Sequence, residues 1–186
     1  MDLPSHALWT FAVEKIFWPD FFKTHHPFLF FSLLFAILPD LIHDVPYTIL
    51  VLINKNKLGL KGIKSVIHFA YDVNRNQPLK YQALFPQVAR LGFFSHSFIT
   101  FLLAAIMLNL IYPPLFWPFV VGYGSHLLVD VPLHNDYFSS KPLYPFHQLT
   151  IPGIITWYNT KNFQKYNYTA LIAVFLLLIL FNRGFK

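Results

Sequence analysis

The chain has 186 residues, of which 55% are hydrophobic and 12% are charged, and it contains no cysteine. Soluble domains are typically about a quarter charged, so this composition argues against an ordinary soluble domain and indicates a membrane protein. The formal net charge is +6, but the basic residues are scattered between apolar stretches, which argues against nucleic acid as a partner. Because cysteine is absent, disulfides and thiolate ligands are excluded, and any metal ion must be held by histidine and carboxylate side chains.

The first predicted element is a short helix near the N-terminus. Residues 8–18 mix charged and apolar side chains in the pattern of an amphipathic helix at a membrane surface, and Pro19 is expected to end it. His6 precedes this helix.

The second element contains a polar segment between two apolar stretches. Residues 28–38 and 46–53 are almost wholly apolar, and the segment between them contains Asp40, His43 and Asp44 and is bracketed by two prolines. Eleven residues are too few to span a hydrocarbon core of about 30 Å. Two alternatives stay open: one long tilted helix with the polar residues in its middle, or a helix that breaks at the prolines and re-enters the membrane.

A basic connection follows in residues 54–92. It contains seven lysines and arginines but only one acidic residue, Asp72. The positive-inside rule therefore predicts that this connection is cytoplasmic.

Residues 91–129 contain no charged side chain and predict two apolar spans, with a hairpin turn at residues 112–114. His96 lies 17 residues before Pro113, and Asp130 lies 16 residues after Pro114. Because each helical arm rises about 1.5 Å per residue, the sequence predicts these two side chains at nearly the same depth. His126 is expected one turn deeper, so three candidate ligands converge at the cytoplasmic end of the hairpin.

The second arm of this hairpin carries the most informative spacing. His126, Asp130 and His134 follow one another at steps of four, which places them on one face of a helix. Pro132 removes a helical hydrogen bond, so His134 and Asp136 are expected in the turn after the helix.

The remaining residues complete a single predicted domain, 1–186. Residues 132–165 form a second polar connection, with aromatic side chains typical of a membrane interface. Residues 166–182 are uncharged and predict a C-terminal transmembrane anchor. The expected fold is an all-α membrane bundle of three to four transmembrane helices, in an inner or plasma membrane, with a metal site on its cytoplasmic side.

The chemistry of the candidate ligands favours a divalent ion. Histidine and aspartate without cysteine favour zinc, with manganese as an alternative, and their number suits one or two ions. The core ligands are expected to be His96, His126 and Asp130. Asp40 is expected to be either a further ligand or the base that acts on water.

The order of these short motifs resembles the membrane-bound, metal-dependent hydrolase family whose type member is LexA-regulated. The motifs, which lie within residues 1–158, are His6, Leu38-Pro39-Asp40 with His43, Ser95-His96-Ser97, Gly122–Asp130, and Pro142–Pro145 followed by Thr156-Trp157. That family is similar to zinc-dependent phospholipase C in its helical His/Asp scaffold. The resemblance implies an integral membrane hydrolase, with His6, His43 and His134 as further ligands.

Two departures from the family pattern keep alternatives open. Ile42 stands where the family often has a second aspartate, and Arg90-Leu91-Gly92 lacks the histidine of the family's His-Arg-Gly. The expected function is hydrolysis of a lipid or another phosphoester or ester by metal-activated water, with membrane lipid or a small molecule as partner. The alternatives are a non-enzymatic membrane protein that binds or moves an ion or acts as a scaffold, and an inactive hydrolase homologue.

Overall fold

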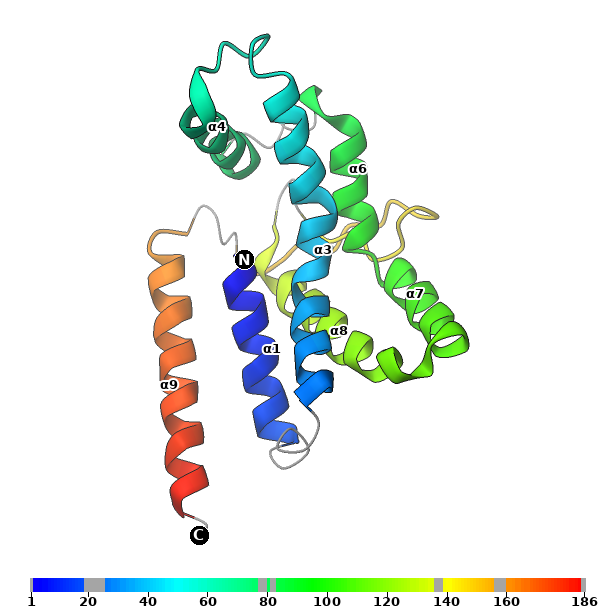
Figure 1. Ribbon diagram of the computed structural model, residues 1–186, viewed down its shortest axis with the longest axis vertical. Helices are drawn as coiled ribbons and strands as arrows, with labels where there is room; N and C mark the ends of the chain where they lie inside the picture. Colours follow the sequence, from blue (N-terminus) through cyan, green and yellow to red (C-terminus); the bar gives the residue numbers. More distant parts are fainter. Residues whose placement is uncertain are drawn as a thin grey trace. The chain divides into compact units, whose positions relative to one another are not determined.

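The computed structural model describes residues 2–18, 26–76, 80, 83–135, 139–155 and 160–184, and this part of the chain is helical, without a strand (Figure 1). The prediction of an all-α fold is therefore confirmed. The α-helices are α1 (Leu3–Phe17), α3 (His26–Ile53), α4 (Gly62–Asn76), α6 (Pro86–Ser95), α7 (Phe98–Ile111), α8 (Phe116–Leu133) and α9 (Phe163–Gly184). A 3-10 turn, η1 (Pro113–Leu115), joins α7 to α8.

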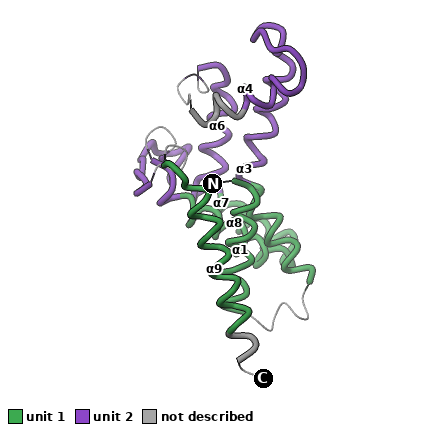
Figure 2. The backbone as a smooth tube through the Cα atoms, turned by 90° about the vertical axis from the view of Figure 1, so that its left-hand side faces the viewer, with its two compact units in different colours: residues 1–38, 101–130, 160–186 green, residues 39–100, 131–159 purple. Residues whose placement is uncertain are grey.

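The chain divides into two compact units (Figure 2). Unit 1 comprises residues 1–38, 101–130 and 160–186, and unit 2 comprises residues 39–100 and 131–159. The helices α3, α7 and α8 each contribute residues to both units.

Two helices are long and apolar enough to cross a membrane, namely α3 and residues 163–180 of α9. A third span results if α6 and α7, which meet at 63°, are counted as one bent span. The single-helix alternative for residues 26–53 is the one observed, because α3 continues through Pro39 and Pro46. The first arm of the predicted hairpin, in contrast, is broken between Ser95 and Phe98.

In unit 1, polar side chains join α1 to α9. The helix α1 begins at residue 3 because the Asp2 carboxylate accepts a hydrogen bond from the backbone N–H of Ser5 at 2.9 Å, which satisfies an unpaired first-turn donor. Asn167 of α9 accepts a bond from Trp9 Nε1 at 2.8 Å and donates one to Ser5 Oγ at 2.7 Å. The hydroxyl of Tyr168 donates to Asp2 Oδ1 at 3.0 Å. These bonds fix the position of the first two turns of α1.

Also in unit 1, α8 lies very close to α3 at Gly122. A Cβ atom at this position would overlap the carbonyl oxygen of Ser32 and would lie 2.8 Å from its carbonyl carbon and 3.0 Å from Phe35 Cβ. Only glycine permits this approach, and it brings the next turn of α8 against the next turn of α3.

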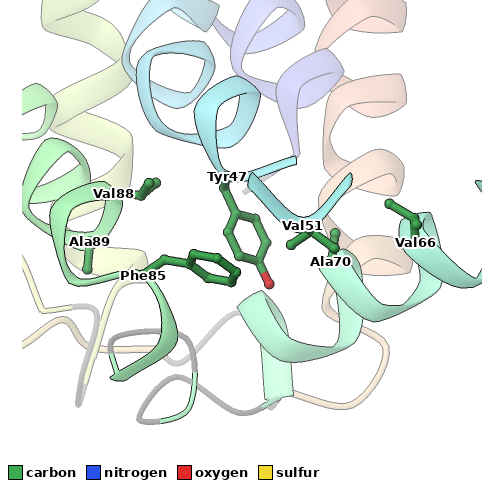
Figure 3. Packing of buried hydrophobic residues seen from close by; sticks show 7 residues of the cluster. All are labelled: Tyr47, Val51, Val66, Ala70, Phe85, Val88 and Ala89. Carbon is green, nitrogen blue, oxygen red and sulfur yellow. The ribbon is translucent and has the colours of Figure 1, made fainter. Parts of the chain in front are cut away.

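Unit 2 contains an apolar core between α3, α4 and the start of α6 (Figure 3). Its buried members are Tyr47, Val51, Val66, Ala70, Phe85, Val88 and Ala89. The Tyr47 and Phe85 rings meet edge to face, with their centroids 5.4 Å apart. This core attaches α4 to the C-terminal end of α3.

Candidate metal centre

The centre in unit 1 begins with one turn of α8. His126 Nε2 lies 3.0 Å from Asp130 Oδ2, and both side chains are almost completely buried. The spacing of four places both side chains on one helix face, as the sequence analysis predicts. The apolar side chain of Leu128, which follows the histidine by two residues, is 69% exposed on another face.

A backbone carbonyl of α3 determines which ring nitrogen of His126 carries the proton. His126 Nδ1 lies 2.6 Å from the carbonyl oxygen of Ala36. A carbonyl oxygen only accepts hydrogen bonds, so Nδ1 carries the proton and donates it. In the neutral ring, Nε2 then presents a lone pair toward the Asp130 carboxylate. This arrangement, in which a carbonyl orients a histidine through its second nitrogen, is typical of metal-ligating histidines.

His6 of α1 completes this centre. His6 Nε2 lies 3.2 Å from Asp130 Oδ1, and the His6 ring stacks on the His126 ring at a centroid distance of 3.8 Å. His6 is 1% exposed, so its ring is shielded from solvent.

The three side chains fit a divalent metal ion. Their ligand atoms all lie within 4.8 Å of one another. Two ligands of a tetrahedral zinc ion, each about 2.0–2.1 Å from the metal, stand about 3.3 Å apart, close to the observed 3.0 and 3.2 Å between the histidine nitrogens and the Asp130 oxygens. Two histidines and one carboxylate form a known donor set for hydrolytic zinc.

Unit 2 gathers most of the other predicted site residues. His96 Nε2 lies 3.3 Å from Asp40 Oδ1, and His43 Nε2 lies 3.2 Å from Asp44 Oδ1. The His43 and His96 rings meet edge to face at 5.5 Å, and the His134 ring lies 6.4 Å from the His96 ring. The side chains of His96 and Asp40 are 18% and 12% exposed, so they are less completely buried than the unit 1 centre.

The break between α6 and α7 positions His96. The His96 ring nitrogen Nδ1 lies 2.9 Å from the carbonyl oxygen of Gly92, which again gives Nδ1 the proton and directs Nε2 toward Asp40. The neighbouring Ser97 hydroxyl lies 3.0 Å from the carbonyl oxygen of Pro142 and 2.6 Å from that of Tyr144. The Pro-Leu-Tyr-Pro segment therefore holds the break in place.

His134 directly follows α8, which continues through Pro132 and ends at Leu133. Its carbonyl oxygen accepts a bond from the backbone N–H of Gly153 at 2.9 Å. A Cβ atom at Gly153 would lie 2.6 Å from that same oxygen, so glycine is needed there. Asp136 and the Thr156-Trp157 pair lie outside the described residues.

The structure thus divides the predicted ligands between the two units. His6, His126 and Asp130 belong to unit 1, and the other predicted ligands, Asp40, His43, His96 and His134, belong to unit 2. Within the continuous helix α3, Asp40 follows Ala36 by one turn, so both lie on the same helix face.

The helix α1 has a buried polar face that was not predicted from the sequence. His6, Thr10 and Glu14 recur at steps of four, and all three are buried. Thr10 Oγ1 lies 2.6 Å from the hydroxyl of Ser125 in α8. Burial raises the pKa of Glu14 from 4.5 to about 7, and this effect outweighs the opposing ones of the Ser32 hydroxyl and Lys15. The available signal was the recurrence of these three polar residues at every fourth position of the helix.

Comparisons with family models, with curated proteins and with solved structures find no match for this chain.

Proposed function

We propose that the protein is a membrane-bound, metal-dependent hydrolase and that His6, His126 and Asp130 hold its divalent ion. The observation that carries this proposal is the paired orientation of His126, with Nδ1 bound to the Ala36 carbonyl and Nε2 directed at Asp130. A neutral histidine lone pair facing a carboxylate at 3.0 Å needs a cation or a shared proton between them. A divalent ion meets this requirement for both histidines at once.

The donor set favours zinc, since imidazole and carboxylate without thiolate suit it. When bound, the ion would supply Lewis acidity and a bound water of lowered pKa. Asp130 would neutralise part of its charge and keep the two imidazole rings in place. The Ala36 carbonyl would hold His126 in the tautomer that leaves Nε2 unprotonated.

The role of Asp40, either as a further ligand or as the base that removes a proton from water, stays a prediction. Its partner His96 donates Nδ1–H to the Gly92 carbonyl, so His96 Nε2 can share a proton with Asp40. His43 and His134 are the remaining candidates for a second ion, as the resemblance to the LexA-regulated hydrolase family implies.

The surroundings of the site support a lipid substrate. The helices α3 and α9 are long and apolar enough to cross a bilayer, which is compatible with a membrane protein. We propose an integral protein of an inner or plasma membrane that acts on a lipid or lipid-linked phosphoester, because such a substrate reaches an enzyme through the membrane.

The test is the metal content of the purified protein beside three variants. We expect about one or two equivalents of zinc in the parent protein and loss of metal in His126→Ala and in the isosteric Asp130→Asn. His68→Ala is the matched control, because His68 lies on an exposed face of α4 and should leave the metal content unchanged. Circular dichroism should show unchanged helix content in each variant.

Unchanged metal in both folded site variants would contradict the assignment, as would the absence of metal after dialysis against zinc. If metal is bound, hydrolysis of phosphodiesters and phospholipids is measured next, with Asp40→Asn as the variant expected to lose turnover while it remains folded.

The near-complete burial of His6 and His126 favours a second candidate, a non-enzymatic membrane protein with a closed ion site. Structural metal sites are closed, whereas catalytic sites keep an open position for water. Retained metal without hydrolysis of any of the tested esters would favour this second function.

A further inference from the structure

Exposed lysines gather on α4 and the turn before it, and they belong neither to the candidate metal centre nor to the apolar core of unit 2. Lys55, Lys57, Lys61 and Lys64 are all exposed, and residues 45–71 contain no acidic residue. Among the residues whose side chains the structure describes, which exclude 71–79, no carboxylate pairs with any of these four lysines. The result is a concentrated positive charge at the C-terminal end of α3.

The same surface carries exposed apolar side chains. Val66 and Ala70 of α4 are buried against Tyr47 and Val51 in the core of unit 2 (Figure 3). Ile63 and Ile67 are 60% and 58% exposed. They lie one turn apart, beside the buried face. The apolar side of the helix therefore extends beyond the residues that are buried in the core.

The order of side chains around α4 is that of an interfacial helix. At about 100° per residue, Ile63 and Ile67 lie between the buried face and the side that carries Lys64 and His68. Lysine can extend its charge toward phosphate while its stem lies along apolar neighbours. Helices of this kind insert their apolar residues at the level of the headgroups.

The position of α4 along the chain also fits a helix at the level of the lipid headgroups. The helix α3 has 28 residues and is therefore about 42 Å long, which exceeds a hydrocarbon core of about 30 Å. The core of unit 2 attaches α4 to the last turns of α3, where a spanning helix of this length leaves the hydrocarbon.

We infer that this surface, made of Lys55, Lys57, Lys61, Ile63, Lys64 and Ile67, binds the headgroup region of an anionic phospholipid bilayer. The isoleucines enter the bilayer surface, and the lysines bind lipid phosphates. Each lysine near an anionic leaflet contributes a favourable interaction that salt screens within a Debye length. This inference is independent of the metal centre.

The test uses the full chain in lipid nanodiscs with an environment-sensitive fluorophore on Ile67→Cys. The chain has no native cysteine, so labelling is confined to this position. We expect the emission to shift to the blue when phosphatidylglycerol replaces part of the phosphatidylcholine, and to shift back in about 1 M salt, where the Debye length is roughly 3 Å.

A matched variant replaces all four lysines by glutamine while keeping the label. It should lose the response to phosphatidylglycerol, and its unchanged circular dichroism and metal content would show that the fold is intact. Equal emission in the two lipids, or an equal shift in the glutamine variant, would overturn the inference. A shift caused by an added oligonucleotide in neutral nanodiscs, without one for phosphatidylglycerol, would assign the surface to nucleic acid and would also overturn it.

Discussion

Replacement of Gly122 by alanine tests how the close approach of α8 to α3 supports the metal centre. The added Cβ would overlap the Ser32 carbonyl, so the two helices must separate by on the order of 1 Å to restore ordinary contact distances. His126 follows Gly122 by one turn, and Ala36 follows Ser32 by one turn. The same separation therefore lengthens the 2.6 Å bond between His126 Nδ1 and the Ala36 oxygen beyond hydrogen-bonding range.

The expected loss of stability is about 1–3 kcal/mol. Overpacking costs about 1–3 kcal/mol and the lost hydrogen bond about 1 kcal/mol, while alanine gains about 1 kcal/mol over glycine in a helix. Loss of the bond that orients the ligand should also weaken metal affinity by about 10–100-fold. Thermal unfolding in detergent and zinc titration measure the two effects separately.

Gly124→Ala is the matched control on the same helix. Its Cβ would lie 3.5 Å from the nearest atom of the Phe101 ring, which is an ordinary contact. We expect this variant to be as stable as the parent or more stable by up to about 1 kcal/mol, with unchanged zinc affinity. If Gly122→Ala unfolds at the same temperature as Gly124→Ala and binds zinc equally well, the proposed coupling between helix approach and ligand orientation is wrong.

Two further predictions concern the buried polar side chains of unit 1. Because burial raises the pKa of Glu14 from 4.5 to about 7, the folded state prefers the protonated acid, so stability should fall as the pH rises from about 4.5 to about 7, by up to about 3 kcal/mol. Glu14→Gln should remove this part of the pH dependence, and equal slopes for parent and variant in unfolding experiments would refute it. Asn167→Ala leaves Trp9 Nε1 and Ser5 Oγ without their partner in α9 and should lower the free energy of unfolding by about 2–3 kcal/mol. The control Thr169→Ala removes only an exposed hydrogen bond within α9 and should lower it by less than about 1 kcal/mol.

The helices of this chain were largely predictable, because long apolar stretches and local spacing are properties of consecutive residues. The pairing of His126 with Asp130 followed from a spacing of four, which needs no knowledge of the fold. The apolar segment at residues 166–182 lies within α9, as expected. The continuity of α3 was not predictable, because two prolines weaken a helix locally and only neighbouring contacts decide whether it breaks.

The composition of the candidate metal centre was less predictable than its helices. His6 entered the prediction only through a family resemblance, since 120 positions separate it from His126 and no periodicity connects them. Its place depends on the bonds of α1 to α9 and on the close contact at Gly122, which are long-range contacts. Side chains that meet through tertiary packing leave no pattern in a single sequence.

The bonds of Asn167 have a consequence for biosynthesis. Asn167 is translated 162 residues after Ser5, the residue to which it donates a hydrogen bond and which directly precedes His6. The N-terminal turn of α1 therefore emerges from the ribosome long before the side chain that fixes it. The centre around His6 can reach its final geometry only after α9 has been made, so an ion that binds there is acquired late, by a nearly complete chain.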